Sequence, residues 1–415
     1  MEKRRAVVIT GLGVISPIGL SVPEAACALV NPASGIVEMS LPPMGKSFPA
    51  GRVARSFTDC FTRLELLSMD RCQQMAVLAA REAIADAGLG SFAADGRRAG
   101  LYYGNVHGGA ATGEASLRQL FAGGRHAAQP FSAMAFMHNG GAAQISIRHQ
   151  ILGPVHTYGS ACASSSAAIG EAGRAIRDGY IDVALAGGAE GPLAASMVSI
   201  FDATRAMAPL DPHDPGRSCR PFSPRRSGFV LGEGAAFVVL EEEGRARRRG
   251  VNVYGYLAGY GVAADAYHIA APNMAGQSAA IRAALSDASL APSAIDYLNA
   301  HATATRNGDI VEAAAIREVF GDPPNSVPVS STKSIHGHLL GAAGALEFLL
   351  TVLAVRDSIL PATAYLEEAD PACALNHIAG KPALHRPVER AMSFSCGFGG
   401  TNVALIVSKH RETPY

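Results

Sequence analysis

Short apolar runs alternate with alanine-rich runs of helical period along almost the whole chain. The apolar runs are bounded by turn residues, mostly glycine, which predicts buried strands. They cover residues 6–11, 98–104, 182–188, 235–242, 253–261, 297–301, 327–333, 391–399 and 403–408. Two longer runs, 72–89 and 276–290, carry apolar residues at the 3.6-residue period and predict amphipathic helices. This alternation predicts an α/β fold with largely buried sheets.

A turn near Gly250 separates two portions that each repeat the alternation of strands and helices. We therefore expect two halves, residues 1–250 and 251–415. A chain of 415 residues is long enough for two domains or one duplicated fold around a large core. A polar, proline-containing stretch at 209–218 predicts a surface loop in the first half.

Charge and cysteine content exclude several classes of function. The chain has 35 basic and 35 acidic residues, so its overall charge does not favour nucleic acid or an anionic membrane. Seven cysteines without a CxxC pair argue against a disulfide framework and a zinc ribbon, and favour a reducing cytoplasm. Glycine and proline interrupt the apolar run at the N-terminus, and no other run is long enough to span a membrane. We expect a soluble cytoplasmic protein.

The segment 159–170, GSACASSSAAIG, places Cys162 among small residues. An extended segment precedes it, and the small residues after it suit a helix that is packed closely on all sides. A helix N-terminus favours the thiolate, which is the nucleophilic form of cysteine. Cys162 is therefore a candidate nucleophile, with a space-filling buried cysteine as the alternative.

The segment 299–309, NAHATATRNGD, follows a predicted strand and is dense in small and hydroxyl residues. His301 could act as an acid–base or hydrogen-bonding group, with Thr303 and Thr305 lining a polar channel beside it. A histidine at the end of a strand can equally be structural.

In the segment 331–347, Lys333 and His338 lie in a turn before another small-residue helix, which carries Glu347. Two histidines in this turn could bind a metal, but the HExxH or CxxC partners of a zinc site are lacking, so we expect no metal. The glycine-rich turn at 393–402, SFSCGFGGTN, could bring a backbone N–H close to a substrate as an oxyanion donor.

Taken together, these segments closely resemble the β-ketoacyl-acyl carrier protein synthases, the Cys-His-His condensing enzymes of fatty acid and polyketide assembly. The resemblance rests on SACASS, NAHATAT, STKSIHGHLLGAAG and GFGGTN, and AVVITGLGVISPIG, GFVLGEGA and ADAYH extend it over essentially the whole chain. It implies the thiolase fold, with two similar βαβαβαββ halves in a five-layered α/β/α/β/α body, usually as a dimer. It also implies that the enzyme binds no cofactor and that its substrates are carried on the phosphopantetheine of an acyl carrier protein.

The resemblance also implies a role for each matching residue. Cys162 would accept the acyl group from the carrier thioester. His301 and His338 would hydrogen-bond the thioester oxygen of a malonyl extender as it loses carbon dioxide. Lys333, with Glu347 as its ion partner, would hold the histidine region in place.

The same resemblance implies how substrates are bound. The backbone N–H groups of Cys162 and Phe398 would form an oxyanion hole. Thr303 and Thr305 would contact the pantetheine arm, and Phe398, followed by Gly399, would gate the acyl pocket.

Some positions depart from the family pattern. Cys396 stands where an aromatic residue usually precedes the glycine-rich turn, and His107 stands where many fatty acid enzymes carry an apolar residue in the acyl pocket. The region that docks the carrier has fewer basic residues than is typical, which leaves Arg63, Arg71 and Arg205 as candidates. These departures favour a specialised or secondary-metabolic synthase over a housekeeping one.

Four alternatives remain at this point. The chain could be the active subunit of a heterodimeric ketosynthase/chain-length-factor pair, or a thiolase-like coenzyme A acyltransferase with Cys396 as its second cysteine. A chain-length partner subunit is disfavoured because such subunits lack the nucleophile. A cysteine protease is disfavoured because the chain has no tryptophan and no CGxCW segment.

Overall fold

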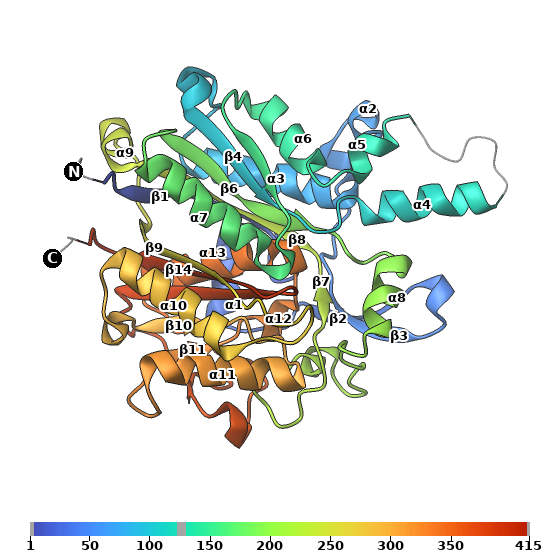
Figure 1. Cartoon of the computed structure of the whole chain (residues 1–415). Helices are drawn as coiled ribbons and strands as arrows, with labels where there is room; N and C mark the ends of the chain where they lie inside the picture. Colours follow the sequence, from blue (N-terminus) through green and yellow to red (C-terminus); the bar gives the residue numbers. More distant parts are fainter. Residues whose placement is uncertain (1–3, 123–129, 413–415) are drawn as a thin grey trace.

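Two groups of strands with the same topology lie one above the other, with two buried helices between them (Figure 1). The computed structural model describes residues 4–122 and 130–412. Within these residues the main sheet follows the order β12-β11-β10-β13-β14-β9-β1-β8-β6-β4-β5. Strands β1 (Val7–Ile15) and β9 (Gly255–Ala264) pair at only two positions, so the array consists of two sheets joined at one edge.

Each sheet repeats one pattern of strand directions. In the first, β1-β8-β6 are antiparallel neighbours and β6-β4-β5 are parallel; in the second, β9-β14-β13 are antiparallel and β13-β10-β11 parallel. The other strands of the first sheet are β8 (Gly234–Glu242), β6 (Val183–Glu190), β4 (Ala99–Gly104) and β5 (Val155–Tyr158). Those of the second are β14 (Thr401–Ser408), β13 (Arg390–Gly397), β10 (Tyr297–Asn299), β11 (Pro328–Ser330) and β12 (Asn376–His377). The repetition confirms the expected duplication of an α/β unit.

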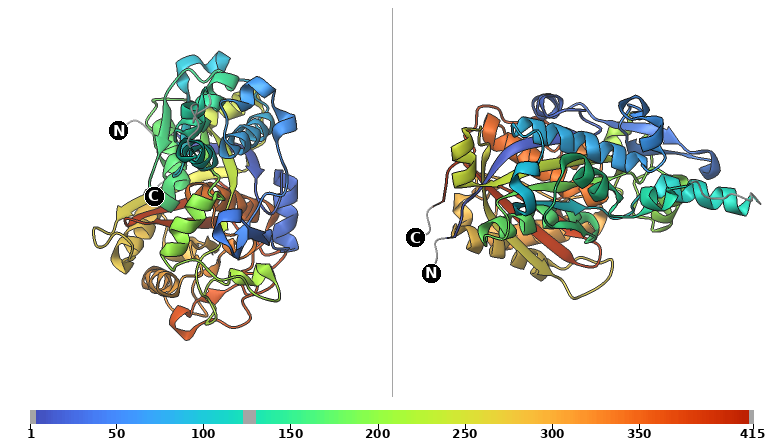
Figure 2. Two further views of the ribbon diagram at one scale, coloured as in Figure 1. Left: turned by 90° about the vertical axis from the view of Figure 1, so that its right-hand side faces the viewer. Right: turned by 90° about the horizontal axis from the view of Figure 1, so that it is seen from above.

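Helices complete five layers. Helices α7 (Ser164–Arg177) and α13 (Ala343–Asp357) pack together between the sheets. Helices α3 (Arg71–Asp86) and α6 (Gly140–His149) pack together beside the first sheet, and α10 (Met274–Ala288) and α11 (Arg306–Phe320) beside the second (Figures 1 and 2). The remaining helices are α1 (Val22–Val30), α2 (Arg63–Leu66), α4 (Ala110–Phe121), α5 (Ser132–Phe136), α8 (Ala195–Ala203), α9 (Glu243–Arg249) and α12 (Lys333–His336).

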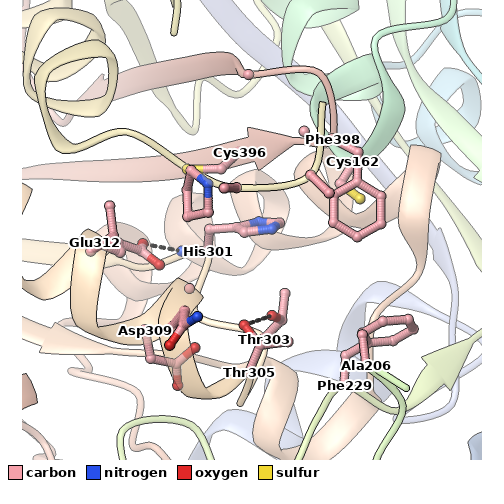
Figure 3. A pocket seen from close by; sticks show the side chains of 18 of the residues that line it. Cys162, Ala206, Phe229, His301, Thr303, Thr305, Asp309, Glu312, Cys396 and Phe398 are labelled. Atoms are coloured by element: carbon pink, nitrogen blue, oxygen red, sulfur yellow. Dashed lines mark hydrogen bonds between the residues drawn. The ribbon is translucent and has the colours of Figure 1, made fainter. Parts of the chain in front are cut away.

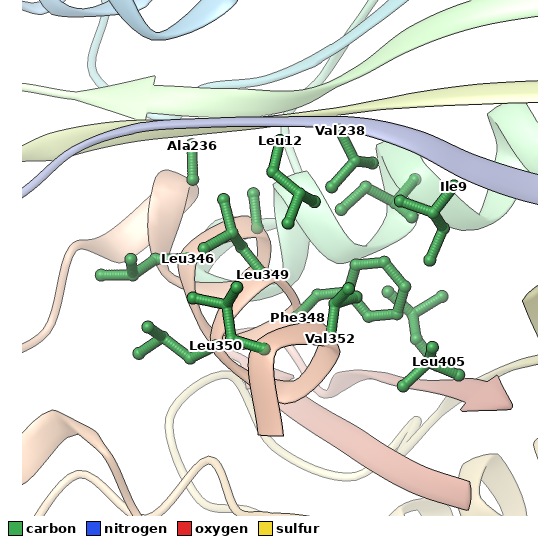
Figure 4. Packing of buried hydrophobic residues seen from close by; sticks show 14 of the residues in the cluster. Ile9, Leu12, Ala236, Val238, Leu346, Phe348, Leu349, Leu350, Val352 and Leu405 are labelled. Atoms are coloured by element: carbon green, nitrogen blue, oxygen red, sulfur yellow. The ribbon is translucent and has the colours of Figure 1, made fainter. Parts of the chain in front are cut away.

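The two central helices have compositions that fit a position between sheets. Helix α13 is buried from Ala343 to Val355, and its leucine, valine and phenylalanine side chains pack against the first sheet and against Leu405 of the second (Figure 4). Helix α7 uses small residues where the second sheet comes close: a Cβ on Gly170 would lie 2.3 Å from the Tyr260 ring. Helix α7 is buried from Ser164 to Gly170, and Arg174 in its last turns is exposed. The close packing predicted from the small residues after Cys162 therefore holds for the first two turns of the helix.

Most predicted elements match the structure. The helices predicted at 72–89 and 276–290 are α3 and α10, and each apolar run contains a strand. The run 327–333 ends as a strand at Ser330, because the chain then turns into the short helix α12. A small sheet of β2 (Ile36–Ser40), β3 (Ser47–Gly51) and β7 (Leu231–Gly232) was not predicted.

We infer that the boundary between the halves lies at Gly250, where α9 ends in a residue with φ of 64° before β9 begins. The first half would then run from β1 to α9, and the second from β9 to β14. This division leaves one complete copy of the repeated strand pattern on each side.

Candidate active site

Cys162 lies at a sharp turn between β5 and α7. It belongs to a short 3₁₀ helix, Ala161–Ala163, and Ala161 has a left-handed φ of 49°. The end of β13 presses against this turn, where a Cβ on Gly397 would lie 2.6 Å from the Ser160 carbonyl oxygen. Glycine at that position therefore lets the second half of the chain reach the cysteine.

The two histidines come from separate loops of the second half. His301 follows β10, and its backbone N–H donates to Glu312 Oε1 of α11 at 2.7 Å (Figure 3). His338 follows α12, and its backbone N–H donates to the Val230 carbonyl oxygen at 2.7 Å. Hydrogen bonds to neighbouring elements thus fix the backbone of both loops.

These three loops converge on one point. One nitrogen of His301, one nitrogen of His338 and the sulfur of Cys162 lie within 4.8 Å of one another. The two rings are edge to face, with centroids 5.3 Å apart and planes at 84°. The arrangement fits two N–H donors beside a nucleophile. One sulfur and two imidazole nitrogens at this spacing could also bind a zinc ion.

Burial dominates the electrostatics of Cys162. Desolvation raises the pKa of its thiol to about 12, although the charge of Lys333 and the backbone N–H of Phe398 act to lower this pKa. The expectation that a helix N-terminus favours the thiolate is therefore not met in the unliganded protein. The local helix field is outweighed by the loss of water around the sulfur.

Both histidines are neutral near pH 7. Desolvation, followed by the charge of Lys333, holds the pKa of His301 and the pKa of His338 well below 6.5. A neutral imidazole carries one N–H donor and one acceptor nitrogen. In each ring Nδ1 is buried without a hydrogen-bond partner among the described residues.

Lys333 and Glu347 form an ion pair that is fully buried behind the histidines. Desolvation raises the pKa of Glu347 to about 7, against the opposing effect of Lys333. The predicted pairing of these two residues is present, from α12 to α13.

We expect Lys333→Met to lower the free energy of unfolding by about 3 kcal/mol, because the variant leaves Glu347 buried without its partner. The deficit should grow above pH 7: without the ammonium group the pKa of Glu347 rises further above about 7, and the folded variant must keep a proton that the unfolded chain releases. Urea unfolding at pH 6 and pH 8 measures both effects. The control Lys333→Met/Glu347→Leu should recover most of the stability, and a single variant as stable as the parent at both pH values would argue against the pair.

A cavity of about 1080 Å³ leads from the surface to Cys162. Thr303 and Thr305 line one wall, with their hydroxyl oxygens 3.3 Å apart (Figure 3). Phe398 is half-exposed beside Cys162, between Gly397 and a glycine with φ of 86°. The cavity is lined by many of the residues singled out in the sequence: Cys162, His301, His338, Thr303, Thr305, Cys396, Phe398, Gly399 and Arg205.

Two family models match most of the chain. The model described as "Beta-ketoacyl synthase, N-terminal domain" matches residues 4–246, and "Beta-ketoacyl synthase, C-terminal domain" matches residues 254–367. The chain belongs to the β-ketoacyl synthase family. This synthase is therefore a condensing acyltransferase, and the cysteine protease alternative is wrong.

Individual relatives agree with the family. The synthase is 37% identical over 414 residues to "3-oxoacyl-[acyl-carrier-protein] synthase 2" of Staphylococcus aureus (strain COL), covering 99% of both chains. It is 41% identical over 343 residues to "Nodulation protein E" of Rhizobium meliloti (strain 1021), covering 83% of both. The solved structure "The ishigamide ketosynthase/chain length factor" matches with a TM-score of 0.90 and 32% identity, over 99% of this chain and 100% of that one. The expected thiolase fold is thus confirmed.

Some of the residues predicted to bind substrate or carrier do not line the cavity. The His107 ring is beyond the cavity lining, edge-on to Phe201 at 5.6 Å, with Nδ1 3.5 Å from Glu190 Oε1. Arg71 is used internally, because it forms two hydrogen bonds to Glu233 and donates to two backbone carbonyls. Arg63 and Arg205 remain the exposed candidates for carrier docking.

Sequence reasoning missed two buried acids on α11 of the synthase. Glu312 holds the backbone of His301, and Asp309 Oδ2 accepts the Phe222 N–H at 2.8 Å. Desolvation raises the pKa of Glu312 to about 8 and that of Asp309 to about 7. The two acids are three residues apart, which places them on one face of a helix directly after the His301 motif. This spacing is the feature of the sequence from which their proximity to His301 could have been predicted.

Within the described residues, no helix of the synthase is both long and apolar enough to cross a lipid bilayer. All seven cysteines lie in the described residues and are free.

Proposed function

We propose that this synthase catalyses decarboxylative Claisen condensation between an acyl group on Cys162 and a malonyl group carried by an acyl carrier protein. The observation that supports it most directly is the convergence of one sulfur and two imidazole nitrogens within 4.8 Å, at the inner end of a cavity. The enzyme itself needs no bound cofactor for this chemistry, since the phosphopantetheine belongs to the carrier.

In the first step the Cys162 sulfur attacks the carbonyl carbon of the acyl thioester. A bond forms between that carbon and the sulfur, the bond to the pantetheine sulfur breaks, and the thiol proton passes to the departing sulfur. The backbone N–H groups of Cys162 and Phe398 stabilise the negative oxygen of the tetrahedral intermediate. The raised pKa of Cys162 supports a thiol that loses its proton only as the thioester reacts.

In the second step the malonyl carboxylate leaves as carbon dioxide, and its bonding electrons move into an enolate. The enolate carbon then attacks the acyl carbon on Cys162, the carbon–sulfur bond breaks, and the thiolate takes up a proton. His301 and His338 each donate an N–H toward the enolate oxygen. Their low pKa values support this role, because a neutral ring donates without becoming a competing acid.

The remaining cavity residues bind and admit the substrate. Thr303 and Thr305 would hydrogen-bond the pantetheine arm, and Phe398 would gate the acyl pocket, beside Gly399 and Cys396. His107 and Phe201 would form the inner part of that pocket, because Phe201 lines the cavity beside Phe229 and the His107 ring packs edge-on against it.

The second subunit would be either another copy of this chain or a homologous chain-length factor. Helix α4 projects from the body of the molecule with α5 beside its inner end (Figure 1), and strand β5 lies at the edge of the first sheet. Large apolar side chains are exposed on both helices: Leu117, Leu120, Phe121, Met134 and Phe136. The second subunit would cover these side chains.

The heterodimer has separate support from the similarity to a ketosynthase/chain length factor structure. Light scattering and intact mass of the complex purified from its native host distinguish the two.

An acyl-loading panel tests the proposed function. The synthase is incubated with carrier-bound acyl groups that differ in length, unsaturation and oxygenation, and intact mass identifies those transferred to the protein. We expect one acyl group per chain, mapped to Cys162 by peptide analysis. Failure of every thioester to acylate a folded enzyme, or acylation at another residue, would contradict the proposal.

A further inference from the structure

Two arginines line the outer part of the cavity that leads to Cys162. Arg205 follows α8, and Arg306 is the first residue of α11. Both residues are exposed. Neither guanidinium forms an ion pair with a carboxylate in the described parts of the chain, in contrast to the internally bonded Arg71. The entrance of the cavity therefore carries positive charge that is free to bind an anion.

The backbone that carries Arg306 is held rigidly. The buried Arg226 donates to the carbonyl oxygens of Thr305 and Arg306 at 3.2 and 2.8 Å. Arg226 is itself fixed by Asp370, with Nη1 2.7 Å from Oδ2. The position of Arg306 is thus set by a network of buried and charge-assisted hydrogen bonds, which restricts its motion at the cavity entrance.

The acids of the cavity do not neutralise this charge. Asp309 and Glu312 are buried. Asp265 accepts hydrogen bonds from the Asn402 side chain at 2.7 Å and from the Asn273 N–H at 3.0 Å. An anion entering with a substrate consequently meets the arginines first.

We propose that Arg306, together with Arg205, binds the phosphate group of the phosphopantetheine arm and positions its thioester at Cys162. A guanidinium presents parallel N–H donors that match two phosphate oxygens. The inference rests on the proposed function, because it assumes that the arm enters this cavity. Both arginines line the cavity itself, which favours the phosphate of the arm over carboxylates on the surface of the carrier.

The test compares donors with and without phosphate. Cys162 is acylated with acyl-phosphopantetheine, with acyl-pantetheine and with the intact acyl carrier, in the parent enzyme and in Arg306→Ala. Loss of a bidentate contact to phosphate should lower kcat/KM roughly tenfold for both phosphorylated donors and leave it unchanged for acyl-pantetheine. Arg306→Lys should recover part of the loss, because it restores charge without the planar donor pair.

Arg225→Ala is the matched control. Arg225 is exposed on the neighbouring segment but lies outside the cavity lining, so its removal changes net charge equally and should leave the ratio between donors unchanged. An equal loss with acyl-pantetheine would overturn the proposal, since Arg306 would then act on the arm or the fold in general. A loss confined to the intact carrier would also overturn it, in favour of carrier carboxylates. If the parent enzyme accepted no donor, the proposed function itself would fail.

Discussion

Cys162→Ala takes up no acyl group from any carrier thioester, and its condensation rate falls by at least about 10³-fold, because the covalent intermediate cannot form. Intact mass spectrometry measures the loading, and product formation measures the condensation. The variant should fold, because the cysteine is a small side chain in a cluster of apolar residues. An acyl mass that persists on the alanine variant would show that Cys162 is not the nucleophile.

A second variant at the same position separates the two half-reactions. Cys162→Gln should still release carbon dioxide from malonyl carrier while forming no condensation product, because its amide resembles the acylated cysteine and leaves both histidines in place. Trapping of released ¹⁴CO₂ measures this. Loss of both activities in a folded Cys162→Gln protein would contradict the separation of acyl transfer from decarboxylation.

His338→Ala should lower malonyl decarboxylation by roughly 10²-fold, the cost of removing one donor to a developing oxyanion, and should affect acyl loading much less. Single-turnover assays measure the two steps separately. His336→Gln is the matched control, because His336 is the last residue of α12, two positions before His338. It hydrogen-bonds Thr332 and is not among the residues that line the cavity. Equal losses of loading and decarboxylation in His338→Ala would reject its assignment to the second step.

The burial of His301 and His338 predicts how decarboxylation depends on pH. Burial lowers the pKa of His301 and the pKa of His338 well below 6.5, so both rings keep their neutral form as the pH falls through 6.5. Decarboxylation by Cys162→Gln should therefore show no loss of activity centred near pH 6.5. A midpoint near 6.5 would indicate that one of the rings is exposed to water when the malonyl group binds.

The fold was largely predictable, because its signals are local. Strands β1, β4, β6, β8 and β14 are apolar over most of their length, and the period of α3 and α10 is visible in the sequence. The small sheet of β2, β3 and β7 escaped prediction. Strand β2 is mostly exposed, and β7 contains only two residues, so neither leaves a clear pattern.

In the candidate site, too, the features carried by local motifs were predicted, and those that depend on distant residues were missed. The motifs predicted Cys162, His301 and His338 as a site, and the structure brings these three side chains together. Lys333 and Glu347 form the ion pair that the sequence predicted. Glu312 was missed, because nothing next to it in the sequence reveals that its carboxylate meets the His301 backbone. Arg71 resembled a surface arginine, because its partner Glu233 is distant in the chain.

The sequence alone determined which segments form strands and helices, which side chains can react, and where glycine permits close approach. Only the tertiary structure decided that three loops meet at one cavity, that the Cys162 thiol stays protonated, and that Arg306 stands free at the entrance. Periodicity and turn preferences act between neighbouring residues, so they can be read along the chain. Desolvation and charge pairing depend on atoms contributed by distant segments, and these come together only when both halves have folded.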